Sequence, residues 1–213
     1  MDHFELKNGV LHAEDVSLAA IADAVGTPVY VYSRATLTRH ARVFRDALSV
    51  LPSVHIAFAV KSNPNLAVLK LLAREGFGAD VVSGGEMDRA LAAGIPPEGV
   101  VFSGVGKTEA ELIRALEAGI GQFNLESEEE GIELATLAAA RGLTASAALR
   151  VNPDVDAGTH GKISTGKAEN KFGVPYDLAG GMYARGSAIL WLPKGTIARL
   201  VQEKADAAAP PKR

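Results

Sequence analysis

The sequence predicts an α/β fold, an incomplete (β/α)8 barrel of the TIM type with about five βα units. Short apolar, β-prone runs recur roughly every 21 to 26 residues; they cover 54–60, 78–82, 100–102, 121–123 and 147–151. Helical patterns follow the first four runs, and such alternation favours a parallel sheet. The short repeat, with no Gly-x-Gly-x-x-Gly after the first strand, favours a barrel over an open dinucleotide-binding sheet.

The first two helices are defined by their starts and stops. The first is predicted to open at Pro64, a first-turn proline, and to end at Gly76. One face of it carries three leucines: Leu66, Leu69 and Leu72. The second covers 86–93 and ends at Gly94.

Capping boxes begin the third and fourth helices. Thr108 with Glu111 starts the third, and Ser127 with Glu130 repeats the device in the fourth. Each helix then stops at a glycine, Gly119 or Gly142. The order strand–helix is therefore repeated four times before the last run.

Polar residues follow the predicted strands, at the ends where a parallel barrel places its functional site. They are Lys61, Asp80, Ser83, Ser103, Asn124 and Arg150. Lys61 follows a buried strand, where burial lowers the pKa of an amine, and a neutral amine attacks an aldehyde such as pyridoxal phosphate. The alternative is a solvated lysine at a strand end. Ser103 and Asn124 can equally be polar because the chain leaves the core there.

Residues 103–108 superficially resemble a phosphate-binding loop, since two glycines precede a lysine and a threonine. Their spacing does not match the Gly-x-x-x-x-Gly-Lys-Ser/Thr pattern. We therefore do not expect nucleotide binding at this position.

Composition and charge exclude other classes of protein. The net charge is −3 and the basic residues are scattered, so we expect no nucleic-acid partner. No signal pattern or apolar run of ~18 residues is present, so we expect a cytoplasmic protein without a membrane partner. Since there are no cysteines and the 5 histidines are dispersed, we expect neither disulfides nor a metal site.

Several longer stretches carry a family resemblance. Three of these stretches are Phe-Ala-Val-Lys-Ser-Asn-Pro-Asn at 58–65, Ala-Asp-Val-Val-Ser-Gly-Gly-Glu at 79–86 and Phe-Asn-Leu-Glu-Ser at 123–127. They resemble the barrel domain of the pyridoxal-phosphate-dependent amino acid decarboxylases, which share the alanine racemase-like barrel. Residues 149–173 and 26–32 are most similar to the diaminopimelate decarboxylase family within that group. The likeness covers about residues 1–180 and corresponds to the N-terminal portion only.

The resemblance implies pyridoxal 5′-phosphate as cofactor and the decarboxylation of meso-diaminopimelate to L-lysine and carbon dioxide. It makes Lys61 the catalytic Schiff-base lysine, and it assigns Asp80 and Arg150 to cofactor binding beside the ring. Glu86 is a candidate for tuning the charge around Lys61. A carboxylate at a helix N-terminus is the alternative for Asp80, and an ion pair at a strand end is the alternative for Arg150. The parent family is expected to form homodimers.

The resemblance also predicts three regions. Residues 1–33 are an N-terminal segment that packs with a β domain in the family, 34–180 are a partial pyridoxal-phosphate-binding barrel, and 181–213 are a tail foreign to the family. After about residue 177 we find no ring-stacking histidine, glycine-rich phosphate segment, pyridine-facing glutamate or C-terminal β domain. We interpret this change as a frameshift, truncation or fusion.

Such an interruption predicts impaired activity of this chain alone, because most of the tasks at the cofactor fall to the absent motifs. A non-catalytic pyridoxal-phosphate-binding barrel and an inactive, purely interacting remnant are the alternatives. An amino acid racemase fits the fold, but the residues at 159–173 favour a decarboxylase. The glycine-rich span 158–173 is interpreted as a loop that orders against substrate or partner, or as a solvated loop.

Overall fold

The computed structural model describes residues 2–152 and 173–175. They belong to two compact units, Met1–Val101 and Phe102–Arg213. The predicted tail at 181–213 lies outside the described residues, as does the predicted loop at 158–173 except for Gly173. Among the described residues, no helix is long and apolar enough to cross a membrane.

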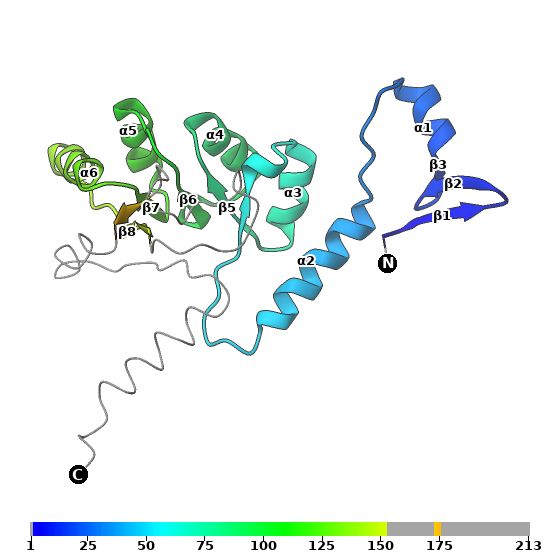
Figure 1. Ribbon diagram of the computed structural model, residues 1–213, viewed down its shortest axis with the longest axis horizontal. Helices are drawn as coiled ribbons and strands as arrows, with labels where there is room; N and C mark the ends of the chain where they lie inside the picture. The colour runs from blue at the N-terminus through cyan, green and yellow to red at the C-terminus, as the bar shows by residue number, and fades with distance from the viewer. Residues whose placement is uncertain (1, 153–172, 176–213) are drawn as a thin grey trace, which may run out of the picture. The chain divides into compact units, whose positions relative to one another are not determined.

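The main sheet has five strands in the hydrogen-bonded order β4-β5-β6-β7-β8, which is also their order in the chain (Figure 1). Their bounds are Ala57–Ala59, Gly78–Val81, Val100–Phe102, Gln122–Leu125 and Ala147–Leu149. The pairs β4–β5 and β7–β8 are parallel. Parallel neighbours in chain order, joined by helices, are the arrangement of a (β/α) barrel, so the predicted fold class is confirmed.

The first unit begins with a three-stranded antiparallel sheet, β1-β2-β3. Its strands are Phe4–Lys7, Val10–Ala13 and Val16–Ser17. Asn8 and Gly9 form the first turn with positive φ angles of 53° and 80°. A two-residue hairpin turn needs such angles to match the right-handed twist of its two strands. Helices α1 (Leu18–Val25) and α2 (Arg34–Leu48) follow.

The hairpin is tied to the start of α2 by a carboxylate. One oxygen of Glu14 accepts hydrogen bonds from Ser33 Oγ at 2.8 Å and from the amide of Ala35 at 2.9 Å. Ser33 is the N-cap of α2, so Glu14 adds a negative charge where the helix dipole favours it. These bonds lower the pKa of the Glu14 carboxyl below its ordinary value.

The rest of the first unit contains η1 (Val60–Ser62), α3 (Leu66–Arg74), α4 (Gly84–Ala92) and η2 (Pro97–Gly99). One apolar cluster joins α2 and α3 to the strands; its members are Leu37, Ala41, Ile56, Phe58, Val68, Leu71, Leu72 and Phe77. Burial of this face, not helix propensity, stabilises helices of this length.

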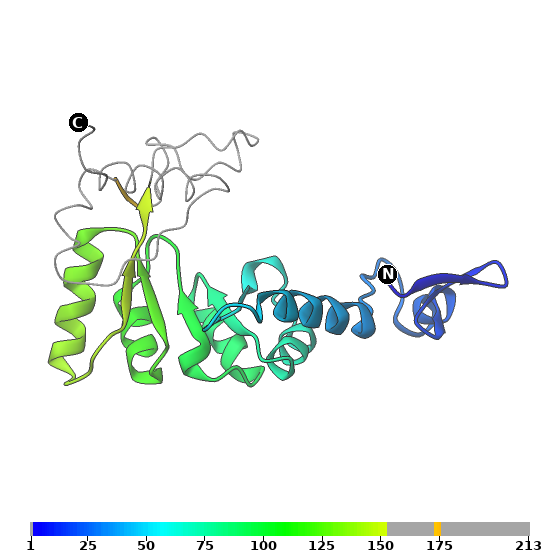
Figure 2. The same cartoon turned by 90° about the horizontal axis from the view of Figure 1, so that it is seen from below.

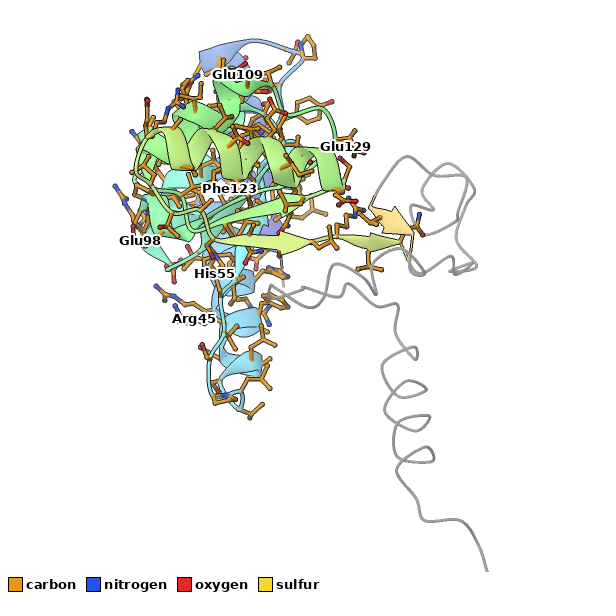
Figure 3. All side chains as sticks on the ribbon, turned by 90° about the vertical axis from the view of Figure 1, so that its left-hand side faces the viewer. Arg45, His55, Glu98, Glu109, Phe123 and Glu129 are labelled. Carbon is orange, nitrogen blue, oxygen red and sulfur yellow. The ribbon has the colours of Figure 1, made fainter. Side chains whose placement is uncertain are left out.

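The second unit contains α5 (Glu109–Ala118), α6 (Glu128–Ala140), β9 (Val151–Asn152) and β10 (Val174–Pro175). Helices α5 and α6 lie on one face of β7 and β8 in Figure 1, and Phe123 of β7 is almost completely buried on that side (Figure 3). Beyond β8, β9 pairs in parallel with β10. The two short strands are drawn in yellow and orange in Figure 2. This pairing brings Val174 next to Val151.

Predicted boundaries are wrong at the first strand and at the start of the first helix. The strand predicted at 54–60 is only Ala57–Ala59, because Val60–Ser62 turn into η1, closed by a 3.0 Å bond from the Asn63 amide to the Val60 carbonyl. The helix does not open at Pro64, since Asn65 is its N-cap and its side chain accepts from the amide of Ala67. The asparagine side chain can accept a hydrogen bond from a free amide of the first helical turn, whereas a proline side chain has no acceptor.

Candidate functional site

Lys61 lies at the carboxyl end of β4, in the single turn of η1. Val60 takes the inward position of this turn and is fully buried, whereas Lys61 is exposed. The expected burial of the amine is therefore wrong in this structure, because Lys61 lies in the turn of η1 after the strand has ended. Lys61 is exposed, and its amine makes no hydrogen bond or ion pair within residues 2–152 and 173–175.

Asp80 is on the neighbouring strand at the same end of the sheet. It pairs in register with Ala59, two residues before Lys61, and η1 packs against β5. Asp80 is half-buried, and besides its strand pairing it has at least one further interaction with the described residues. The first unit thus brings an accessible amine and a carboxylate to adjacent strand ends.

The start of α4 orders the chain beyond Asp80. Ser83 is the N-cap and accepts from the amide of Glu86 at 3.3 Å. The Glu86 carboxylate turns back to accept from the amide of Val82 at 2.9 Å. Arg89 donates to the carbonyl of Pro64 at 3.3 Å and so holds the loop after Lys61. Glu86 therefore has a capping role, and its expected influence on the charge around Lys61 stays a prediction.

In the second unit, Lys107 of the loop resembling a phosphate loop is directed inward. Only 1% of its side chain is exposed, and its amine forms an ion pair with Glu130. It also donates to the carbonyls of Gly104 at 2.8 Å and Asn124 at 2.7 Å. An ammonium group has three donors, and all three are used here. Lys107 therefore fixes the loop and is not presented to a nucleotide.

Glu126 is the central acceptor at the carboxyl end of β7, and only 4% of its side chain is exposed. Its Oε1 accepts from Arg150 and from the amide of Gly104, both at 3.1 Å. Its Oε2 accepts from the amide of Gly173 at 2.9 Å. A buried carboxylate is tolerated only when paired and hydrogen-bonded in this way.

Arg150 therefore has the ion pair that the sequence allowed as its alternative interpretation. The Arg150 side chain is 33% exposed, so it is only partly buried by this pairing. Ser103 and Asn124 are joined to each other by a 2.9 Å bond from the Asn124 amide to Ser103 Oγ. These two residues thus form a polar contact between the ends of β6 and β7.

Sequence reasoning missed Lys107 and Glu126 as members of this cluster and recognised Glu130 only as a cap. Glu126 and Glu130 of the cluster lie where β7 has ended and α6 starts, and Figure 3 labels Glu129 in this first turn of α6. A signal was present, since a glutamate directly before a helix N-cap is placed at a strand end. Among the described residues, no group of three or more His, Cys, Asp or Glu could hold a metal ion.

Comparisons with known proteins agree with the fold. The family model described as "Pyridoxal-dependent decarboxylase, pyridoxal binding domain" matches residues 34–186. The chain is 53% identical over 190 residues to diaminopimelate decarboxylase of Pseudomonas fluorescens, a match that covers 89% of this chain and 45% of the relative. These matches confirm the resemblance seen in the sequence.

Solved structures give the same result. Diaminopimelate decarboxylase from M. jannaschii, in co-complex with L-lysine, matches with a TM-score of 0.74 at 38% identity over 85% of this chain and 43% of that chain. The corresponding enzyme from Helicobacter pylori, complexed with L-lysine, has a TM-score of 0.73 at 41% identity over 81% and 44%. The chain spans less than half the length of these relatives.

Proposed function

Because the chain belongs to the pyridoxal-dependent decarboxylases, we propose that it binds pyridoxal phosphate for the decarboxylation of meso-diaminopimelate to L-lysine and carbon dioxide. The observation that carries this proposal is the accessible amine of Lys61 at the end of β4, one strand away from Asp80. The substrate follows from the names of the relatives, which are diaminopimelate decarboxylases over 89% of this chain. A second copy of the chain is the proposed protein partner.

The residues present fit the aldehyde end of the cofactor. A primary amine that is exposed and unpaired among the described residues is the group that an aldehyde requires, so Lys61 would hold the cofactor covalently through Nζ. Asp80 and Arg150 would contact the ring, the first with negative and the second with positive charge. When bound, pyridoxal phosphate supplies an electron sink for the electrons that carbon dioxide leaves behind.

The chain's own residues then have separate tasks. Lys61 would hold the aldehyde group of the cofactor through its amine, and that amine would be the basic group at the reacting end. The backbone of Asp80 is fixed in β5, which packs against η1. Arg89 restrains the loop after Lys61 through the carbonyl of Pro64.

Borohydride trapping tests the assignment of Lys61. The purified chain is incubated with pyridoxal phosphate and reduced with borohydride, and the labelled peptides are mapped by mass spectrometry. We expect the label on Lys61 and its loss in Lys61→Ala, because reduction turns the bond to the aldehyde into a stable secondary amine. Lys70→Ala is the matched control, since Lys70 is an exposed lysine on α3. Label spread evenly over surface lysines would contradict the assignment.

Turnover is tested separately, by release of carbon dioxide and L-lysine from meso-diaminopimelate, with L-ornithine as the competing amino acid. Formation of L-lysine, abolished by Lys61→Ala, supports the decarboxylase. Covalent labelling of Lys61 without any product would instead favour a protein that binds pyridoxal phosphate and does not turn over substrate.

A further inference from the structure

We propose that Glu126 is a positioning residue that holds Arg150 in the orientation needed for cofactor binding. The proposal rests on the proposed function, in which Arg150 contacts pyridoxal phosphate. Glu126 itself is not expected to touch the cofactor, because its side chain is almost completely buried. Both residues lie in the second compact unit, and all contacts used below are within it.

Arg150 is attached to the end of β7 at two points. Its amide donates to the carbonyl of Leu125 at 2.9 Å, and its guanidinium donates to Oε1 of the next residue, Glu126, at 3.1 Å. One attachment fixes where the backbone of Arg150 lies, and the other fixes the direction of a long side chain. An unpaired arginine side chain samples many rotamers, so the second contact reduces the entropy lost when a ligand binds.

Glu126 is in turn held from the opposite side. Its amide donates to Oε2 of Glu130 at 3.0 Å, and Oε1 of Glu130 pairs with the buried amine of Lys107. Lys107 is anchored to the carbonyl of Asn124, two residues before Glu126. These contacts fix the backbone of Glu126, while its carboxylate is held by the amides of Gly104 and Gly173.

Glu126 also binds the amides of Gly104 and Gly173, so a role in folding alone is the competing explanation. The two explanations differ in what depends on Arg150. If Glu126 acts through Arg150, substitution of Glu126 weakens cofactor binding only while the arginine is present. If Glu126 acts only by holding the loops, its substitution weakens cofactor binding equally with and without the arginine.

A double-mutant cycle on pyridoxal phosphate binding separates them. The dissociation constant is measured by equilibrium dialysis for the full chain and for Glu126→Gln, Arg150→Ala and the double variant. A hydrogen bond between charged groups corresponds to about tenfold in affinity, so we expect Glu126→Gln to weaken binding about tenfold in the wild-type chain. We expect it to have no effect in the Arg150→Ala background. An equal loss in both backgrounds would overturn the proposal.

Glu128→Gln is the matched control, because it removes the same charge from an exposed residue of α6, and it should leave the dissociation constant unchanged. Thermal unfolding of each variant confirms that the folded chain is being compared. Borohydride labelling of Lys61 is read in the same samples. Absence of label in the wild-type chain refutes the proposed function, whereas normal label with an unchanged dissociation constant in Glu126→Gln refutes only the role of Glu126.

Discussion

Single buried charges decide how the loops of the second unit are held. Lys107 and Glu130 have side-chain exposures of 1% and 12%, and each also binds backbone groups. Such a pair contributes little net stability relative to apolar residues, but the loss of one partner leaves a charge without compensation. Substitution of one partner should therefore lower the free energy of unfolding more than substitution of both partners.

Lys107→Met should lower the free energy of unfolding by about 3 kcal/mol, because Glu130 stays buried without its cation. The double variant Lys107→Met/Glu130→Gln should recover part of this loss, since no charge then needs a partner. Urea denaturation followed by circular dichroism measures both values and that of Glu130→Gln alone. Additive effects of the two substitutions would show that the residues do not interact.

Gly78 lies where two backbone segments approach closely. A Cβ at this position would lie 2.2 Å from the carbonyl oxygen of Gly99 and 2.6 Å from the His55 ring. The carbonyl belongs to the backbone before β6 and cannot rotate away as a side chain can. Residue 78 must therefore be glycine for β5 to pack in this register.

Gly78→Ala should destabilise the chain by about 3 kcal/mol, at the upper end of the cost of overpacking. Gly85→Ala, on α4, is the control, because the nearest atom to its Cβ is Ser83 Oγ at 4.0 Å and alanine favours the helix. The midpoint of thermal unfolding should fall for the first variant and stay unchanged or rise for the second. Equal midpoints would mean that the backbone relaxes around the new methyl group.

Among the elements, helix ends were the most predictable and strand ends the least. The capping box of Thr108 and Glu111 and the left-handed Gly119 at the end of α5 are confirmed, because both depend on residues within one turn. The Ser127 box is only half confirmed: Ser127 caps Glu130, but Glu130 reaches past it to the amide of Glu126. Local patterns predict which residues cap, and tertiary contacts decide which amide is bound.

Helices α2 and α3 are joined by a carboxylate at the end of α3. Glu75 accepts two hydrogen bonds from the guanidinium of Arg42, at 2.9 and 3.0 Å, and lies 3.7 Å from Arg45. The hydrogen bond from Arg42 is the main cause that lowers the pKa of Glu75 below its ordinary value of 4.5. A bidentate pair of this kind fixes the register between the two helices.

This shift predicts how stability depends on pH. Because the pKa of Glu75 is lower in the folded state, its contribution is present above the unfolded value of 4.5 and is lost as the pH falls through the folded pKa. Glu75→Gln should therefore flatten the fall of the unfolding midpoint between about pH 6 and about pH 3. Glu98→Gln, an exposed glutamate in η2, should leave that slope unchanged (Figure 3). A slope unaffected by Glu75→Gln would contradict the shift.

For the molecule as a whole, the sequence predicted the fold further than the site. The periodic runs predicted all five strands of the main sheet, and β6 was predicted with its observed bounds, because alternation of strand and helix is a short-range property. The partners of the Glu126 carboxylate are 22, 24 and 47 residues away, so no local pattern contains them. The assignment of Lys61, Asp80 and Arg150 to the cofactor remains a prediction for the labelling and binding experiments.

The order of the strands predicts which amides are protected. Among the described residues, β4 and β8 each have one paired neighbour, whereas β5 and β7 each have two. An edge strand presents amides without partners and opens locally at a low free-energy cost. Amides of β4 should therefore exchange with deuterium faster than those of β5 in the first unit, and those of β8 faster than those of β7 in the second.

Hydrogen exchange followed by mass spectrometry measures these rates on peptides that cover each strand. The control is a repeat at about tenfold lower protein concentration, because pairing of an edge with a second copy is lost on dilution. If β4 is as well protected as β5 at both concentrations, its outer edge is covered within the chain, and the edge assigned to it here is wrong. If its protection falls on dilution, the edge strand is the surface through which two copies associate.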